Sequence, residues 1–212
     1  MTLSWKTPCD PIIRWAGAAI HRAVASSDNG PWAIFNENAG SAGLLYGAKG
    51  TSYEGGVRVP AIFWGPGRVK PATVLEMGST LDLLPTLCGL AGAAVPADRV
   101  YDGQSLAPVL NGTGKSPRTE MFYYHGTRLF AVRKGDYKLY YYKNNPVGYP
   151  EKIEKLENHT LYNLQHDPSE RFDLAAKQPE KVKEIDALAR AHQASMVIAP
   201  SHLEKRIGMQ TR

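Results

Sequence analysis

The sequence predicts a mixed α/β chain that ends in an α+β unit, where an antiparallel sheet packs against one helix. Apolar and polar residues alternate in short runs between positions 121 and 142, which is the pattern of strands. A helical pattern begins at Pro179, with apolar residues on one side and charged residues mostly on the other. An earlier helix is predicted over residues 79–92, after a long loop.

The composition is that of a folded globular chain. Its 212 residues suit one ordinary domain or one large piece of a bigger one, and 43% of them are hydrophobic. The net charge of +5 comes from scattered basic residues that are interleaved with acids, so no nucleic-acid partner is predicted. Two cysteines exclude a disulfide scaffold, and the short apolar runs exclude a membrane-spanning helix.

The first part of the chain has a weak pattern and then a long loop. Spacing of apolar residues favours a short helix over 12–24. Residues 28–58 are rich in Gly, Asn and Ser, and a long ordered loop of this kind tends to be functional. A strand over 57–64 is predicted next, with Pro60 near its start.

The elements that follow carry clear capping and turn signals. Ser79 or Thr80 is the expected cap of the helix that ends at Gly89 to Gly92, and Pro85 predicts an early kink. Residues 102–112 predict one or two helical turns closed by a glycine. Strands are then expected at residues 121–124, 129–133, 137–142 and 161–164. The turn at 134–136 makes the middle pair a hairpin, so the whole is an antiparallel meander.

Three short groups of residues have chemistry that suits a binding site. Asp28 and Asn29 offer hard oxygen ligands for Ca²⁺ or Mg²⁺, although the same residues are also common in an ordinary turn. Lys49 lies between glycines and could reach an anion, or it could be a solvated loop lysine. Arg58 follows paired glycines and could pair with a buried carboxylate or an anionic ligand.

Read together, these groups form a long and particular string. Asp-Asn-Gly-Pro at 28–31 is followed by Gly-x-Lys-Gly-Thr-x-Tyr-Glu-Gly-Gly-Val-Arg-x-Pro at 47–60. Further motifs follow in order at residues 79–87, 102–106, 112–118 and 161–171. Over about residues 26–200 the chain resembles the sulfatase family of the alkaline-phosphatase-like superfamily, most closely the arylsulfatase A and N-acetylgalactosamine-6-sulfatase branch.

The resemblance implies roles for individual residues. Asp28 and Asn29 match the pair that ligates the active-site cation, usually Ca²⁺, and Lys49 matches a lysine that contacts the sulfate. His125 stands at the start of the C-terminal subdomain, where it could reach the substrate or be an ordinary surface-loop histidine. The implied substrates are sulfated carbohydrates or aryl sulfates.

The resemblance also implies an organisation in three parts. Residues 1–25 resemble nothing in the family, residues 26–118 correspond to a remnant of the N-terminal domain with the metal and sulfate loop, and residues 119–212 form the C-terminal subdomain. The expected fold is therefore the C-terminal part of the alkaline-phosphatase-like α/β fold. Because much of the family's central sheet has no counterpart in this chain, we expect the first third either to be poorly ordered or to expose apolar surface.

The nucleophile of the family is not encoded in its usual form. Sulfatases use a formylglycine made from the cysteine of Cys-x-Pro-x-Arg, whereas the run that starts at Cys9 has Arg14 one residue too late. We interpret this run as coincidence and assign Cys88 to the core. Two oxygen ligands also fall short of the roughly six to eight that Ca²⁺ takes.

The predicted function is that of a sulfuric ester hydrolase fragment, arylsulfatase-like and inactive alone. The alternative is a catalytically dead module that binds sulfate or a sulfated glycan; another sulfo- or phospho-transfer member of the superfamily fits the string less well. No motif indicates an oligomeric state. No signal peptide is predicted in this chain, although members of the family are commonly exported.

Overall fold

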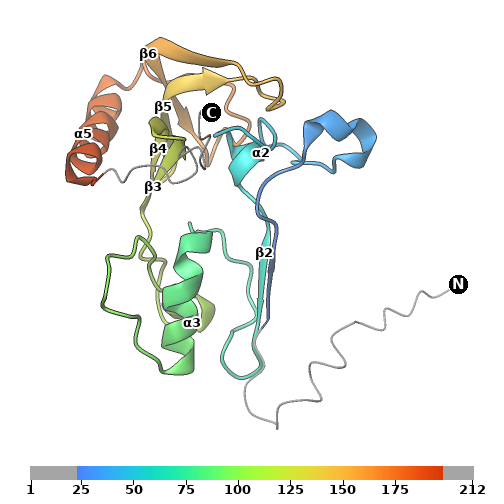
Figure 1. The fold of residues 1–212 in the computed structure, drawn as a ribbon, viewed down its shortest axis with the longest axis vertical. Coiled ribbons are helices and arrows are strands. Elements are labelled where there is room, and N and C mark those ends of the chain that lie inside the picture. Colours follow the sequence, from blue (N-terminus) through green and yellow to red (C-terminus); the bar gives the residue numbers. More distant parts are fainter. Residues whose placement is uncertain (1–22, 198–212) are drawn as a thin grey trace, which may run out of the picture.

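The computed structural model describes residues 23–197. A four-stranded sheet with one long helix forms one end of the described chain, and a helical segment with a two-stranded ribbon forms the other (Figure 1). The run at Cys9 and most of the helix expected over 12–24 lie outside the described residues. The last two positions of that expected helix belong to a strand instead, because they pair with residues far along the chain.

The predicted meander is confirmed. Its strands are β3 (Glu120–His125), β4 (Arg128–Lys134), β5 (Tyr137–Asn144) and β6 (Ile153–Asn163). They pair antiparallel in the order β3-β4-β5-β6, and Gly135 makes the β4–β5 turn with a φ of 58°. The final strand begins at Ile153, earlier than the sequence pattern indicated, because β5 extends to Asn144 and offers it a partner.

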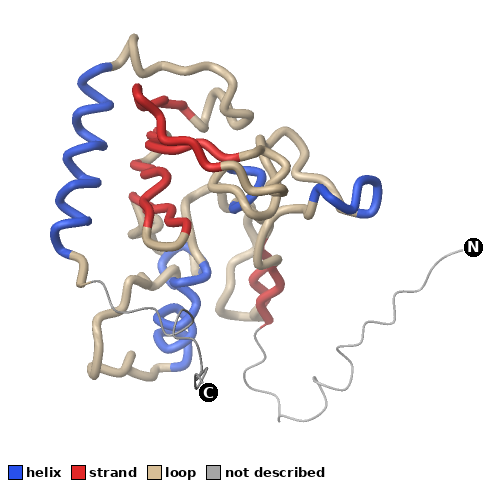
Figure 2. Tube along the Cα trace, turned by 45° about the horizontal axis from the view of Figure 1, so that its top comes forward, coloured by secondary structure: helices blue, strands red, loops and turns tan. Residues whose placement is uncertain are grey.

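The helix predicted at Pro179 is α5 (Pro179–Ser195), which packs along one face of this sheet (Figure 2). The shared core consists of Leu129, Val132, Leu139, Leu161, Ile185 and Ala189. Most of these side chains are fully removed from solvent, so burial of their apolar surface is what joins the helix to the sheet.

The opposite face of the sheet is covered by the glycine-rich loop. Tyr53 from this loop packs against Ala131 of β4 and Tyr140 of β5. The loop contains the 3-10 helix η1 (Ala33–Asn38) and the short helix α2 (Glu54–Val57). The strand predicted over 57–64 is therefore too long at its start: the amide of Val57 bonds to the carbonyl of Tyr53, which places it in α2.

The remaining strand is β2 (Ala61–Trp64), which pairs antiparallel with β1 (Ala23–Ser26) in a ribbon that stands apart from the main sheet. Its side chains are poorly covered, with Ile62 66% exposed and Trp64 46% exposed. Apolar surface is thus exposed in this part of the chain, as the sequence led us to expect.

The helix predicted over 79–92 is confirmed as η2 (Thr80–Asp82) running into α3 (Leu83–Ala91). Ser79 caps it in a capping box, and Gly92 ends it with a φ of 73°. The change from 3-10 to α geometry lies just before Pro85, which occupies the first turn. A further short helix, α4 (Ala107–Leu110), ends before Gly112, as predicted. In the described part of the chain, none of the helices is both long and apolar enough to cross a bilayer.

Candidate functional site

The structure brings the Asp-Asn pair (Asp28 and Asn29) and the lysine loop (residues 45–57, which carry Lys49) into one neighbourhood. The amide of Gly30 donates to the carbonyl of Gly56 over 2.9 Å, and the amide of Lys49 donates to the carbonyl of Pro31 over 2.9 Å. These two bonds cross-link residues 28–32 with residues 45–57. Asp28 is exposed beside this junction, so the predicted cation ligands and the predicted sulfate contact lie on linked segments.

The glycines at this junction are required by close packing. A Cβ atom on Gly30 would lie 1.8 Å from the carbonyl oxygen of Gly55, and one on Gly55 would lie 2.3 Å from that of Gly47. Gly56 has the same restriction against Ala48, at 2.5 Å. Any side chain would force the segments apart, so the paired glycines allow the backbones to touch.

The ammonium group of Lys49 has an aromatic neighbour. Its Nζ lies 5.2 Å from the centroid of the Trp32 ring, within the range of a cation–π interaction. Within residues 23–197, no carboxylate forms an ion pair with this lysine. The side chain is half-buried, which leaves its donors available to an anion.

The loop that carries Lys49 is fastened to the C-terminal sheet through a buried ion cluster. Lys138 on β5 is fully buried, and its Nζ donates to the carbonyl of Ser52 over 2.7 Å and to Oε1 of Glu54 over 2.8 Å. Glu170 completes the cluster: its Oε2 accepts the amide of Glu54 over 2.8 Å, and its Oε1 accepts from the hydroxyl of Tyr140. The N-terminal end of α2 is thereby tied to the sheet.

The charges of this cluster support one another. Burial on its own would raise the pKa of Glu54, but the nearby Lys138 and Arg133 cations outweigh burial and lower it. Burial would likewise lower the pKa of Lys138, yet the surrounding Tyr123, Glu54 and Glu170 groups raise it. Burial raises the pKa of Glu170, against the opposing pull of the same lysine. The pair of Lys138 and Glu54 is therefore held in its charged form.

Arg58, the third candidate from the sequence, also belongs to this cluster. Its Nη1 lies 3.9 Å from Oε2 of Glu54, and Nη1 of Arg133 lies 3.5 Å from the same oxygen. That oxygen is buried and accepts no hydrogen bond in the described part of the protein. Arg58 thus pairs with a buried carboxylate, one of the two roles that the sequence left open.

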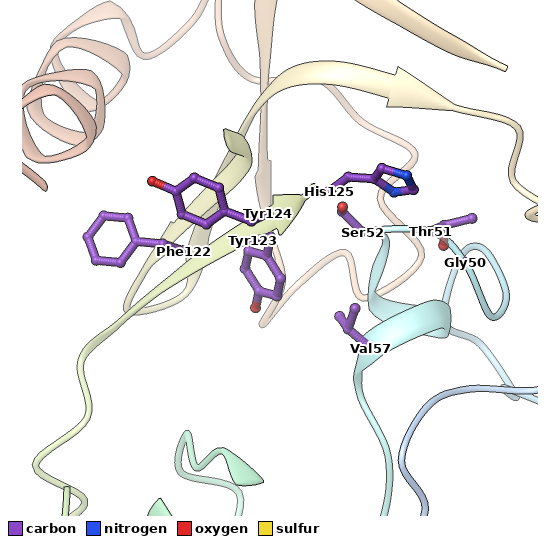
Figure 3. Close-up of a pocket in the computed structure, with 8 residues that line it drawn as sticks. All are labelled: Gly50, Thr51, Ser52, Val57, Phe122, Tyr123, Tyr124 and His125. Carbon is purple, nitrogen blue, oxygen red and sulfur yellow. The ribbon is translucent and has the colours of Figure 1, made fainter. Parts of the chain in front are cut away.

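His125 is the last residue of β3 rather than a loop residue. It lines a cavity of about 340 Å³ between β3 and the segment that follows Lys49 (Figure 3). The cavity is bounded by Gly50, Thr51, Ser52, Val57, Phe122, Tyr123, Tyr124 and His125. Nε2 of His125 lies 2.5 Å from Oε1 of Glu151, and the two side chains are 39% and 46% exposed. The imidazole therefore stands at an accessible edge beside the lysine loop.

Comparison with known proteins places the chain among proteins of one family. Residues 24–93 match the family model described as sulfatase, and residues 116–211 match the one described as the C-terminal region of aryl-sulfatase. The chain is 36% identical over 200 residues to arylsulfatase A of Bos taurus, and 34% identical over 202 residues to N-acetylgalactosamine-6-sulfatase of Homo sapiens. Each alignment covers 84% of this chain.

The fold agrees with these matches. The structure of the PsFucS1 sulfatase from Pseudoalteromonas sp. superposes with a TM-score of 0.75 at 25% identity, over 82% of this chain and 37% of that one. This chain belongs to the sulfatase family. It spans 39% of the length of the bovine arylsulfatase A and 38% of the human N-acetylgalactosamine-6-sulfatase.

A sulfatase cation site needs more ligands than this chain brings together. The oxygens of Asp28 and Asn29 are of the kind that Ca²⁺ prefers, but Ca²⁺ takes about six to eight of them. Among the described residues, no group of three or more His, Cys, Asp or Glu side chains converges in a way that could hold a metal. The residues described therefore do not fit a complete calcium site, and no step below depends on one.

Sequence reasoning missed the residues that hold this sulfatase loop in place. Lys138 lies in a strand pattern, and its only signal is a charged residue between apolar neighbours on a central strand. Glu170 falls within the late motif but carries no local sign that it reaches α2. Trp32 directly follows the Asp-Asn-Gly-Pro motif, and this adjacency was the available clue. Cys88 is only half-buried on α3 and is not part of the buried core, so its assignment to the core was wrong: the apolar face of α3 has little cover among the described residues.

Proposed function

We propose that this chain supplies the sulfate-recognition part of a sulfuric ester hydrolase of the arylsulfatase type. The observation that carries the proposal is the lysine loop: Lys49 stands between glycines, forms no ion pair with a described carboxylate, and is fastened to the C-terminal sheet through the Lys138 cluster. An unpaired ammonium on a fixed backbone suits an anion whose charge must be stabilised while a bond breaks.

In this proposal Lys49 donates to a sulfate oxygen and offsets its negative charge. Donors that are already in place need no reorganisation when charge develops on the ester oxygens, which is the main source of such stabilisation. Asp28 and Asn29, on the linked segment, are proposed to contribute two oxygen ligands to the family's cation site. His125 and Glu151 are proposed to contact the part of the substrate beyond the sulfate.

The cavity beside His125 favours a carbohydrate as the group that carries the sulfate. The lining includes hydroxyl groups of Thr51 and Ser52 from the loop and of Tyr123 from β3, together with the imidazole of His125, and these can form hydrogen bonds with sugar hydroxyls. The relative N-acetylgalactosamine-6-sulfatase is named for a sulfated sugar. An aryl sulfate remains the alternative substrate, and the two classes are separated by the binding experiment below.

We further propose that the 212-residue chain hydrolyses no sulfate ester alone. The formylglycine motif Cys-x-Pro-x-Arg is absent from its sequence, so the group that attacks sulfur in the family is not encoded here. The three-part organisation is also retained as a proposal, with a boundary near residue 118. Arg118 is still bonded to Asp82 of the first part, whereas Glu120 already begins β3.

The second candidate function is a catalytically dead module that binds a sulfated glycan. It is favoured by the same observation, because the loop around Lys49 is fully built although the nucleophile is not encoded. Incubation of the purified chain with 4-nitrophenyl sulfate tests the common expectation that it has no turnover. Release of 4-nitrophenol above the rate of a Lys49→Ala variant would contradict that expectation.

A binding measurement distinguishes a sulfated-glycan-binding module from a fragment that has no function of its own. We expect calorimetric titration with galactose 6-sulfate to show binding that Lys49→Ala abolishes and that Lys115→Ala, a change at an exposed lysine outside the lysine loop, leaves intact. Galactose without sulfate tests the anion requirement, and 4-nitrophenyl sulfate tests the sugar requirement. Absence of binding by every sulfated ligand would contradict the proposed function.

A further inference from the structure

Trp32 is placed beside the lysine by the backbone itself. It is the residue that directly follows Asp-Asn-Gly-Pro, and it stands at the N-cap of η1. The residue before it, Pro31, accepts the amide of Lys49. Because this bond fixes the two segments relative to each other, the indole ring and the lysine side chain leave their backbones at neighbouring points.

The contact between them holds the cation without using its hydrogen-bond donors. Nζ of Lys49 lies 5.2 Å from the indole centroid. A carboxylate partner, such as Glu54 is for Lys138, would occupy the donors and compete with an incoming anion. An aromatic face attracts the ammonium through its quadrupole and leaves the N–H groups free to point at a sulfate oxygen.

The indole ring is in turn held from two sides. Phe35 meets it edge-to-face at a centroid separation of 4.8 Å, and Tyr149 meets it at 6.2 Å. Its Nε1 is buried and has no hydrogen-bond partner among the described residues. The orientation of the ring is therefore set by packing against aromatic neighbours rather than by a hydrogen bond.

Tyr149 belongs to the C-terminal subdomain, in the connection between β5 and β6. The same connection touches the backbone of the lysine loop: a Cβ atom on Gly148 would lie 2.0 Å from the carbonyl oxygen of Lys49. One on Gly50 would lie 3.3 Å from Cε2 of the Tyr149 ring. The β5–β6 connection thus packs on both the lysine backbone and the ring that faces its ammonium.

We propose that Trp32 is a positioning residue for Lys49, with Tyr149 as its support from the C-terminal subdomain. This inference rests on the proposed role of Lys49 as the sulfate contact. The indole holds the ammonium at the site while leaving its donors to the anion, and the tyrosine makes this arrangement depend on the C-terminal subdomain.

The first test needs no ligand. An indole face shifts nearby protons upfield, so the Lys49 side-chain methylene resonances of the full chain should lie upfield of those of an exposed lysine such as Lys115. Trp32→Leu should return them to ordinary positions, whereas Trp32→Phe should retain part of the shift. Unshifted Lys49 resonances in the unsubstituted chain, with β4 and β5 amides at folded positions, would overturn the proposal.

The second test measures affinity for galactose 6-sulfate and for inorganic sulfate. Trp32→Leu should weaken binding about threefold to tenfold, the range expected for a partly buried cation–π contact. Trp32→Phe should restore much of it, and Tyr149→Ala should have a smaller effect. Trp64→Leu, at an exposed tryptophan on β2, is the matched control and should change nothing.

The outcomes of the two tests are distinct. Tighter binding by Trp32→Leu would overturn the proposal, since the ring would then be a competitor that withdraws the ammonium from the anion. Equal affinity of Trp32→Leu and the unsubstituted chain would overturn it as well. Failure of the unsubstituted chain to bind any sulfated ligand contradicts the proposed function instead, while the resonance test still decides whether Trp32 holds Lys49.

Discussion

The lysine loop on the C-terminal sheet and the β1–β2 ribbon with α3 both contain apolar residues, but these residues are covered to very different extents. Ile185, between α5 and the sheet, is fully buried, whereas Ile62 on β2 is 66% exposed. Lys138 is buried with two carboxylates, whereas two leucines of α3 face solvent, with Leu84 45% exposed and Leu87 41% exposed. An apolar pattern therefore predicts an element, but burial depends on whether the same chain also supplies the surface that covers it.

The second region is not without internal structure. Asp82 is fully buried and accepts hydrogen bonds from the backbone of Ser79 and Gln104, at 2.8 Å each, and from the Arg118 guanidinium. Thr86 accepts the amide of Leu106 in the same way. One face of α3 is thus held by polar contacts to residues 102–118, while its leucine face lacks cover in the described structure.

The largest loss of stability is expected from a substitution of Lys138, the buried cation that joins the lysine loop to the sheet. Lys138→Met removes the cation between Glu54 and Glu170 and leaves two buried carboxylates without it. Loss of one partner of a buried ion pair costs about 3–5 kcal/mol. The free energy of unfolding, measured in urea by circular dichroism, should fall by that amount.

The matched control for this change is Lys143→Met on the same strand. Its ion pair with Glu154 is about half exposed at both ends, so its removal should change stability little. Similar losses for the two variants would contradict the assignment of the Lys138 cluster as the fastening of the loop.

Two isoleucines, one buried and one exposed, allow the two regions to be compared without a change of charge. Ile185→Ala removes buried methyl groups from the core under α5 and should cost about 2–5 kcal/mol. Ile62→Ala removes the same groups from an exposed position and should cost less than about 0.5 kcal/mol. Urea unfolding of both variants measures the difference, and a large loss for Ile62→Ala would show that β2 is covered in solution.

The Asp82 contacts predict a dependence on pH. Burial would raise the pKa of Asp82, but the hydrogen bonds from Arg118 and from the backbone of Gln104 and Ser79 lower it below its usual 3.8. A lowered folded-state pKa adds stability that is complete above the unfolded pKa and is lost as pH falls through the folded one.

Asp82→Asn should therefore be less stable than the unsubstituted chain near neutral pH, by about 1–3 kcal/mol. The difference should shrink in acid, below about pH 4, where the aspartate of the unsubstituted chain takes up a proton. Thermal melts of both proteins between neutral pH and acid measure this difference in stability. A stability difference between the two proteins that stays constant down to pH 2 would contradict the proposed lowering of the Asp82 pKa.

The smallest change in stability is expected from polar substitution on the ribbon. Trp64→Ser removes an apolar side chain that is 46% exposed. The free energy of unfolding should therefore change by no more than about 0.5 kcal/mol. Self-association, measured by sedimentation velocity, should fall because an exposed apolar patch is a contact surface. An unchanged tendency to associate would show that Trp64 is not part of such a contact.

The elements that were predicted well from the sequence are those with local signals. The meander and α5 follow from alternation and from an amphipathic stripe, and η2 with α3 follows from Ser79 and Gly92. The strand β1 was missed because its partner β2 lies far along the chain and its own residues give a helical spacing. The short helix α2 was missed because its two glycines disfavour a helix unless packing imposes one.

The candidate site divides in the same way. Asp28, Asn29 and Lys49 were found because they belong to a motif. Lys138 and Tyr149 were not found because their role depends on which face of the sheet the loop covers, and no local pattern encodes that. The contacts between residues distant in sequence are what bring the segments of the motif together.

Native-state hydrogen exchange tests most directly whether the lysine loop and the C-terminal sheet form one unit. The amide of Glu54 donates to Glu170 and that of Gly55 to Tyr46, both within this unit, and the amides of β5 are bonded in the sheet. The amide of Lys49 donates to Pro31 of the adjoining segment. We expect these amides to open with the same free energy, well above that of the β1–β2 amides, and Lys138→Met to lower the loop values selectively. Loop amides that exchange as fast as those of β1–β2 in the unsubstituted chain would contradict the claim.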